Sequence, residues 1–155
     1  MSDTRQTFRV YGSWKGLTAT SGEISSSFSN LRLEFSAPVA DGGQPGFTSP
    51  EEMLLGTAVS ALSTALVDLC LQMAIDLAEL TVEADLIRDY SELDGNVIKE
   101  IKMRPTAKFR TGLGFEKVHD MWWRAVARAP QVSPVLRALN AVMRVKVEPA
   151  ISGGF

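Results

Sequence analysis

In four segments of the chain, apolar residues occupy alternate positions, which predicts strands with one buried face. The segments are residues 8–12, 31–35, 80–86 and 101–109. A turn signal at Asp94-Gly95 lies between the last two segments, which therefore predict a long hairpin. Pro105 lies inside the second strand of this hairpin and predicts an edge strand or a bulge, because proline has no N–H to donate.

A long apolar segment between residues 49 and 78 predicts a buried helix. It follows a loop rich in glycine and proline, "PVADGGQPGFTSP", which we expect to be mobile. Ser49 is the predicted N-cap, Pro50 takes the first helical position, and Glu52 completes a capping box. The segment is apolar nearly all round, which is typical of a helix buried on most sides. Small residues in its middle, such as Gly56 and Ser60, leave room for a second helix to come close.

The remaining pattern predicts two helices and a last strand. Residues 114–128 predict a helix whose tryptophans and methionine form core or dimer interface, with core positions at Val118, Met121, Trp122 and Ala125. A second helix begins at Ser133, a predicted cap, with Pro134 in its first turn. Residues 144–151 predict the last strand. With three N-terminal strands, this order indicates an α+β protein with a mostly antiparallel sheet.

Composition limits the classes of function. The 155 residues are 45% hydrophobic and 22% charged, enough for one core, so we expect a single domain over residues 1–155. A net charge of -2 argues against a nucleic-acid partner. The longest uncharged apolar run, residues 53–67, is short for a membrane span, and the N-terminus lacks the apolar core of a signal peptide. The single cysteine, Cys70, excludes an intrachain disulfide, and we expect a cytoplasmic protein without a membrane partner.

Two motifs carry a resemblance to a known family. The order of elements, with "SPEEMLLGTAVSAL" at residues 49–62 and "PQVSPVL" at residues 130–136, resembles the OsmC/Ohr family of osmotically induced and organic hydroperoxide resistance proteins. The resemblance covers about residues 8–147. It implies antiparallel sheets wrapped around a long central helix, in an intertwined homodimer with active sites at the subunit interface. It also implies reduction of organic hydroperoxides by two cysteines that a dithiol re-reduces.

The residues for that chemistry match only in part. The family's first reactive cysteine stands eleven residues after the helix-start proline, where this chain has Ala61. The second falls at Pro130, or at Ala129 if the register shifts by one residue. Glu51 matches the family's helix-start glutamate, but residues 13–15 lack the arginine that pairs with it in the hydroperoxide-resistance branch. The resemblance therefore predicts the fold without the redox pair.

Cys70 is poorly placed to replace the missing thiols. It follows Ala61 by nine residues, which on a helix is about half a rotation away and about 13 Å further along the axis. Its sequence neighbours are apolar, and burial among them would raise the pKa of the thiol. We therefore interpret Cys70 as a buried structural thiol.

Other candidate chemistry is weaker. Ser60, Ser63 and Thr64 lie near Ala61, but a serine nucleophile needs a base, for which His119 and Glu51 are the candidates. The sequence has no Gly-x-Ser-x-Gly pattern, so a hydrolase is the weakest hypothesis. With one histidine and one cysteine, we expect no metal site and no cofactor.

The favoured hypothesis is a homodimer that has lost thiol peroxidase chemistry and either binds a small, fairly apolar molecule at the subunit interface or is purely structural. The predicted ligand-binding residues are Glu51, Thr57, Ser60, Ala61 and Thr64. The alternative is a thiol-dependent organic hydroperoxide peroxidase using Cys70, whose sulfenic acid would need an external thiol as reductant.

Overall fold

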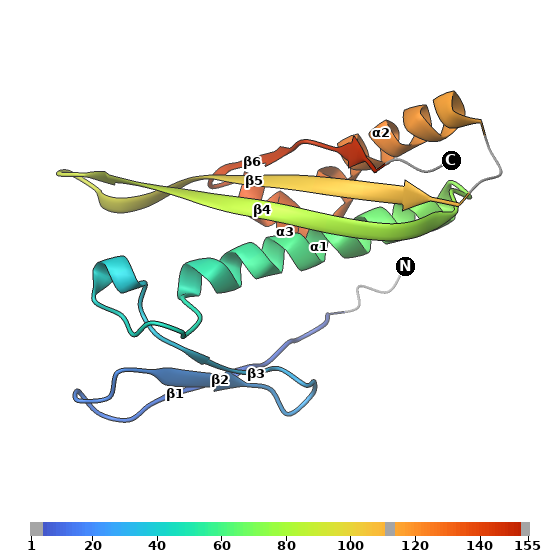
Figure 1. The fold of residues 1–155 in the computed structure, drawn as a ribbon. Helices are drawn as coiled ribbons and strands as arrows, with labels where there is room; N and C mark the ends of the chain where they lie inside the picture. The colour runs from blue at the N-terminus through green and yellow to red at the C-terminus, as the bar shows by residue number, and fades with distance from the viewer. Residues whose placement is uncertain (1–4, 111–113, 153–155) are drawn as a thin grey trace. The chain divides into compact units, whose positions relative to one another are not determined.

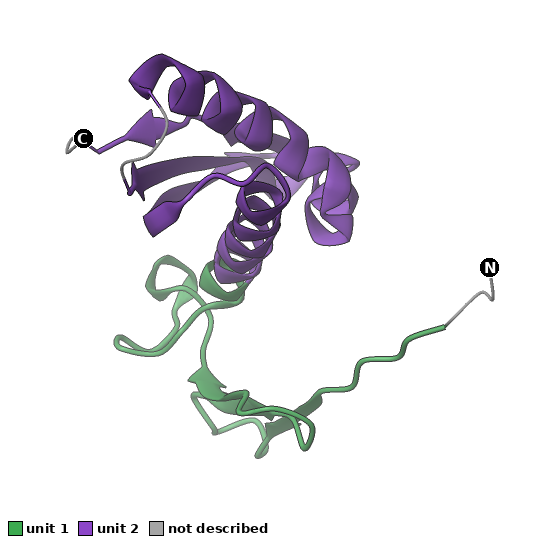
Figure 2. Cartoon of the chain, turned by 90° about the vertical axis from the view of Figure 1, so that its right-hand side faces the viewer, with its two compact units in different colours: residues 1–53 green, residues 54–155 purple. Residues whose placement is uncertain are grey.

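The computed structural model describes residues 5–110 and 114–152. The chain divides into two compact units, Met1–Met53 and Leu54–Phe155 (Figure 2). The single-domain organisation expected from the sequence stays a prediction. The first helix of the chain begins in the first unit and continues through the second.

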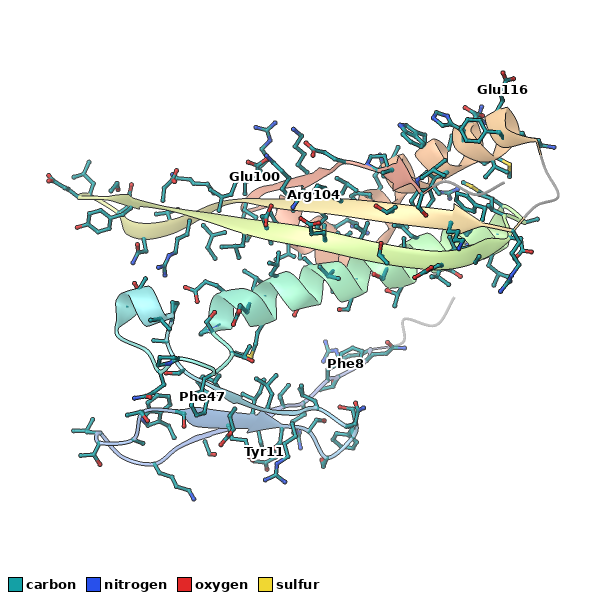
Figure 3. The ribbon with its side chains drawn as sticks, in the orientation of Figure 1. Phe8, Tyr11, Phe47, Glu100, Arg104 and Glu116 are labelled. Atoms are coloured by element: carbon teal, nitrogen blue, oxygen red, sulfur yellow. The ribbon has the colours of Figure 1, made fainter. Side chains whose placement is uncertain are left out.

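The first unit contains a three-stranded antiparallel sheet in the order β1 (Tyr11–Trp14), β2 (Gly22–Ser25) and β3 (Arg32–Phe35) (Figure 1). The sequence placed the first strand on Phe8, Val10 and Gly12. This is wrong at its start, because pairing with β2 begins only at Tyr11, opposite Ser25. Figure 3 labels Phe8 on the extended segment that precedes β1, where its side chain is 87% exposed.

The Gly-rich loop after β3 contains the short 3-10 helix η1 (Val39–Asp41) and is anchored at its base. The buried Ser36 hydroxyl donates to the Thr20 carbonyl at 2.8 Å and accepts from the Gln44 amide at 3.0 Å. Gly43 packs so closely that a Cβ there would lie 1.6 Å from the Ala37 carbonyl oxygen. Several side-chain and backbone contacts thus fix the path of the chain into the long helix.

The long helix α1 (Pro50–Gln72) begins as predicted. The Glu52 amide donates to the Ser49 hydroxyl at 3.2 Å, and the Ser49 amide donates to the Glu52 carboxylate at 3.0 Å, which confirms the capping box. Among the described helices, only α1 is long and apolar enough to cross a bilayer, judged by length and composition alone. A core helix passes the same test, so this is weak evidence for a membrane span.

The end of α1 corrects the sequence prediction, which extended the helix to residue 78. The amides of Ala74 and Ile75 donate to the carbonyls of Leu71 and Cys70, the two bonds of a Schellman motif. Ala74 has a φ of 53°, the left-handed conformation that glycine usually provides there. The sequence contains no glycine to indicate this helix end, because the residue in the left-handed conformation is an alanine.

The second unit is built on a sheet of four strands: β4 (Leu77–Ser91), β5 (Gly95–Phe109), β6 (Arg144–Val147) and β7 (Ala150–Ile151). The predicted hairpin of β4 and β5 is confirmed as an antiparallel pair. Both β6 and β7 run parallel to β5. Figure 1 shows α1 running along the length of the hairpin.

Pro105 lies in an interior strand without a bulge, so the edge-or-bulge prediction is wrong. Met103 and Ala107, two residues to either side, accept from the amides of Glu148 and Ser152. Because alternate residues of a strand direct their backbone groups to the same neighbour, the missing N–H of Pro105 faces the same strand. It falls at the interruption between β6 and β7, where no donor is required.

Two further helices cover the buried face of this sheet. Helix α2 (Phe115–Val132) runs four residues past its predicted end and includes Pro130. Helix α3 (Pro134–Asn140) starts as predicted, with the Ser133 hydroxyl accepting from the Leu136 amide. One core joins α1, β5, α2 and α3, and its fully buried large side chains include Leu62, Leu66, Ile101, Met103, Trp122 and Leu136.

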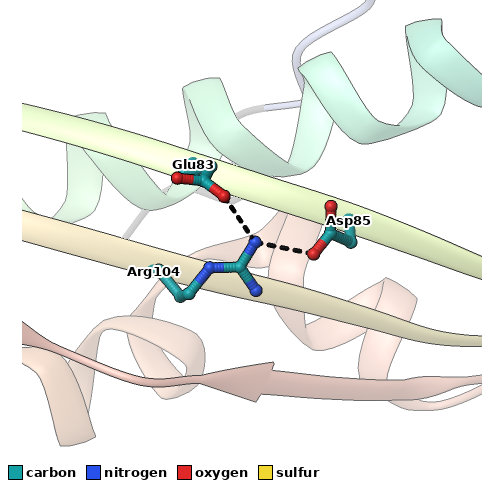
Figure 4. A network of polar contacts seen from close by, with 3 residues as sticks. All are labelled: Glu83, Asp85 and Arg104. Atoms are coloured by element: carbon teal, nitrogen blue, oxygen red, sulfur yellow. Dashed lines mark hydrogen bonds and ion pairs between the residues drawn. The ribbon is translucent and has the colours of Figure 1, made fainter.

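The other face of the sheet carries paired charges. Arg104 donates to Glu83 at 2.9 Å and to Asp85 at 2.6 Å across the hairpin (Figure 4). Lys146 pairs with Glu148 at 2.8 Å on the same sheet. Opposite charges on neighbouring positions of a sheet stabilise the pairing of its strands.

The conformation of Ala74 gives a stability prediction. Ala74→Gly should stabilise the protein by about 0.5–1 kcal/mol, because glycine adopts a positive φ without the cost that Cβ imposes but loses more freedom on folding. Denaturant unfolding measures the change. The matched control, Ala127→Gly at an exposed position inside α2, should destabilise by about 1 kcal/mol. Equal losses in both variants would contradict the assigned helix end.

Candidate functional site

The side of α1 away from the core carries a row of exposed residues. They are spaced three and four residues apart, so they lie along one side of the helix. We call this row the α1 stripe; it consists of Thr57, Ser60, Thr64, Val67 and Leu71. The alternating spacing of three and four is that of helices that pack along their length.

Two hydroxyl groups of the α1 stripe, those of Ser60 and Thr64, bond within the helix. Ser60 Oγ donates to the Thr57 carbonyl at 3.0 Å, and Thr64 Oγ1 donates to the Ser60 carbonyl at 3.0 Å. The remaining members, Val67 and Leu71, are 52% and 77% exposed. Because these two hydroxyls bond internally and Val67 and Leu71 expose aliphatic groups, the α1 stripe suits contact with an apolar surface.

The sequence-predicted site residues lie in different environments. Thr57, Ser60 and Thr64 are on the α1 stripe, whereas Glu51 is half-buried in the first turn of α1. Ala61 is half-buried and packs against the core of the second unit. Their assignment as a ligand site stays a prediction.

The two positions matched to family cysteines border the same core. Ala129 is fully buried in the core cluster against which Ala61 packs. Pro130, the other candidate for the second position, is half-buried in the last turn of α2. An alanine or a proline thus stands at each position, partly or fully buried, and neither position supplies an ionisable side chain.

Cys70 lies on the buried side of α1 and is 1% exposed. Burial raises the pKa of its thiol from an ordinary value of 9.0 to about 11. At neutral pH the thiolate is therefore a very small fraction, and an oxidant has little access to it. The interpretation of Cys70 as a structural thiol agrees with this environment.

The serine and histidine candidates do not form a catalytic pair in the described part of the chain. Ser63 Oγ donates to the Val59 carbonyl at 2.8 Å, and Ser60 Oγ is likewise bonded to its own helix. His119 lies on α2, where its ring stacks on Trp123 with centroids 4.1 Å apart. Within residues 5–110 and 114–152, no three His, Cys, Asp or Glu side chains gather as a metal site.

Two neighbouring tryptophans of α2 lie in different environments, and the predicted core position of Trp122 is confirmed. Trp122 is fully buried and meets Phe109 edge to face, with centroids 5.7 Å apart. Trp123 is 38% exposed and lines a surface cavity between α2 and β6. No sequence pattern indicated this cavity. Helix α2 and strand β6 were each predicted from their own residues, and nothing in either segment indicates that the two lie side by side.

Comparisons with known proteins agree with this architecture. A family model described as OsmC-like protein matches residues 40–148. An OsmC-like protein of unknown function from Vibrio cholerae has a TM-score of 0.75 at 12% identity, over 94% of this chain and 99% of that chain. An organic hydroperoxide resistance protein OsmC from Legionella pneumophila gives 0.69 at 18% identity, over 96% and 100%. OhrB, the organic hydroperoxide resistance protein of Bacillus subtilis, gives 0.62 at 20% identity, over 94% and 98%. No curated protein matches the sequence.

The two sheets and three helices thus define an α+β protein of the OsmC/Ohr fold, which confirms the predicted fold class. The family match covers well over half of the chain, and the chain belongs to the OsmC-like family. The homodimer implied by the resemblance stays a prediction.

The raised pKa of Cys70 predicts a pH dependence of stability. The folded state retains the thiol proton up to a higher pH than the unfolded state, so the free energy of unfolding should fall as pH rises from about 9 to 11. At pH 11 the loss should reach about 2 kcal/mol. Denaturant unfolding of the wild type and of Cys70→Ala across this range measures it. The variant should lack this component, and parallel pH profiles would refute the assignment.

Proposed function

We propose that this chain forms a homodimer through the α1 stripe, binds a small, fairly apolar molecule beside that interface and does not reduce hydroperoxides. The state of Cys70, the only cysteine, carries this proposal, because a peroxidatic thiol must be accessible and ionised. At the positions proposed for the family's reactive cysteines, Ala61 and Pro130 offer no thiol. The cytoplasm remains the proposed compartment.

The α1 stripe supports the proposed homodimer. A helix on the surface of a monomer normally turns several charged residues to solvent, but over four turns this side of α1 carries only Asp68, at the edge of the stripe. Its small residues at Thr57, Ser60 and Thr64 allow the backbone of a second helix to come close, and Val67 and Leu71 supply apolar contact. A second copy of α1 is a self-complementary partner for such a row.

A cavity next to the α1 stripe supports binding of an apolar molecule. It has a volume of about 540 Å³ and lies between the end of α1 and the start of β4. Val67 and Leu71 line it together with Ile75 and Leu80. Its lining is mostly aliphatic but also includes Ser63, the thiol of Cys70 and the carboxylates of Asp76 and Glu79. Two of the similar structures are named organic hydroperoxide resistance proteins, which favours an organic molecule as the ligand.

The proposal predicts binding without turnover. With tert-butyl hydroperoxide and a dithiol, the purified protein should show no reduction above Cys70→Ala, because no accessible thiolate is available. The stable product analogue tert-butanol should raise Tm in a saturable manner, since a ligand that binds only the folded state stabilises it. Peroxide consumption and thermal unfolding measure the two quantities.

The outcomes separate the competing functions. Turnover that Cys70→Ala removes would identify Cys70 as a peroxidatic residue and refute the proposal. A Tm that does not rise with tert-butanol, at concentrations below those at which the alcohol itself unfolds proteins, would refute ligand binding and leave a structural dimer.

The dimer gives a separate prediction. Ser60→Arg should convert the protein from dimer to monomer, because a long charged side chain would be buried in the middle of the α1 contact without a partner. Light scattering after size exclusion measures the mass. The matched control, Thr81→Arg on the exposed face of β4, should remain dimeric. A wild-type protein of monomer mass at micromolar concentration would contradict the interface.

A further inference from the structure

Helix α2 has a second apolar row besides its buried face. The core face is formed by residues such as Val118, Trp122 and Ala125. A second row follows the flank of the helix beside β6 and consists of Phe115, His119, Trp123, Ala127 and Pro130. The first four are four residues apart, so they lie on one side of the helix. This flank is exposed, and the core does not account for its aromatic side chains.

The lower part of this row borders a cavity of about 310 Å³. The volume suits one small ring system rather than a large cofactor. Helix α2 forms one wall, and β6 with the following residue forms the other. The lining residues are Trp123, Val126, Ala127, Pro130, Val145, Val147 and Pro149, and none of these side chains ionises.

The indole ring of Trp123 is held in place from one side. The ring of His119 stacks on it with centroids 4.1 Å apart and planes inclined by only 16°. The ring of Phe115 in turn lies beside the ring of His119, with centroids 5.9 Å apart. Trp123 remains 38% exposed while it lines the cavity, so its aromatic surface is fixed before a ligand arrives. A fixed aromatic wall favours a flat ring, because offset stacking adds to the energy of simple burial.

Among the described residues, no charged side chain lines the cavity. On α2, Arg124 pairs with Asp120 at 2.9 Å. On the strand side, Lys146 and Glu148 pair with each other at 2.8 Å on the opposite face of the sheet, away from the cavity. An ionic ligand would find no uncompensated charge in the lining and would lose hydration on entry. The electrostatic surroundings therefore favour a neutral molecule.

We infer that the cavity between α2 and β6 binds a small, flat, uncharged aromatic molecule, with Trp123 as the stacking surface and the prolines and valines as the opposite walls. The site lies within one chain. It uses neither Cys70 nor the α1 stripe and is independent of the proposed dimer and its ligand.

The experiment uses 2-naphthol as the probe, with the full chain at neutral pH. Titration should shift the indole N–H signal of Trp123 and the methyl signals of Val126, Val145 and Val147 in a saturable manner. The saturated analogue 2-decalol has the same carbon skeleton but is not flat, and it should bind at least about fivefold more weakly. The signals of Val67 and Leu71 on the α1 stripe report any binding elsewhere.

Variants test the role of the indole. Trp123→Ala should weaken 2-naphthol binding about tenfold or more, and Trp123→Phe should stay within about threefold of the wild type. Ala127→Glu, which places a charge in the cavity, should abolish binding. The matched control Tyr90→Ala removes an exposed aromatic ring that belongs neither to the lining nor to the stack on Trp123, and it should leave the affinity unchanged.

Several results would overturn the inference. These are no saturable shift with 2-naphthol, shifts confined to the α1 stripe, equal affinity for 2-decalol, or wild-type affinity in Trp123→Ala. A change of the Trp123 and Val145 signals on dilution of the free protein would also overturn it, because a second copy of the chain would then occupy the cavity.

Discussion

Packing of one side of α1 against the β4–β5 hairpin determines most other features of the second unit. Leu62 and Leu66 are fully buried on that side, opposite Ile101 and Met103 on the buried face of β5. Burial of each such side chain contributes about 1.5–3 kcal/mol, so rotation of the helix about its axis is strongly disfavoured. The orientation of the helix then fixes which residues reach solvent, and these are the small and aliphatic residues of the α1 stripe.

The same orientation of α1 buries the thiol of the only cysteine. Cys70 follows Leu62 and Leu66 on the inner side of the helix, so it contributes to the core as a small apolar group. The positive end of the helix dipole, which could stabilise a thiolate, is about 30 Å away along the axis. An OsmC-like scaffold is thus retained while the conditions that make a cysteine reactive are absent around the one cysteine in the chain.

Local signals in the sequence predicted local structure well. The capping box at Ser49 and Glu52, the Ser133 cap and the Asp94-Gly95 hairpin all depend on residues adjacent in sequence, and the structure contains each of them. Failures occurred where a distant neighbour decides the outcome. Pro105 is accepted in an interior strand only because the strand beside it is interrupted.

The candidate sites were harder to predict for the same reason. The apolar residues around α1 indicated burial on most sides, yet only the hairpin and the other helices determine which side is buried within one chain. Helical spacing predicted the burial of Trp122 but indicated no role for the adjacent Trp123. Only the position of β6 beside α2 turns one of them into the wall of a cavity.

Pro149, in the break between β6 and β7, has a consequence for the solubility of the sheet. The amide of Glu148 points inward to Met103, so the backbone nitrogen of the next residue points to the open edge. As a proline it offers no donor there, and an incoming strand from another molecule would meet a gap in the row of hydrogen bonds. The edge is thereby protected against the uncontrolled strand addition from which β aggregates grow.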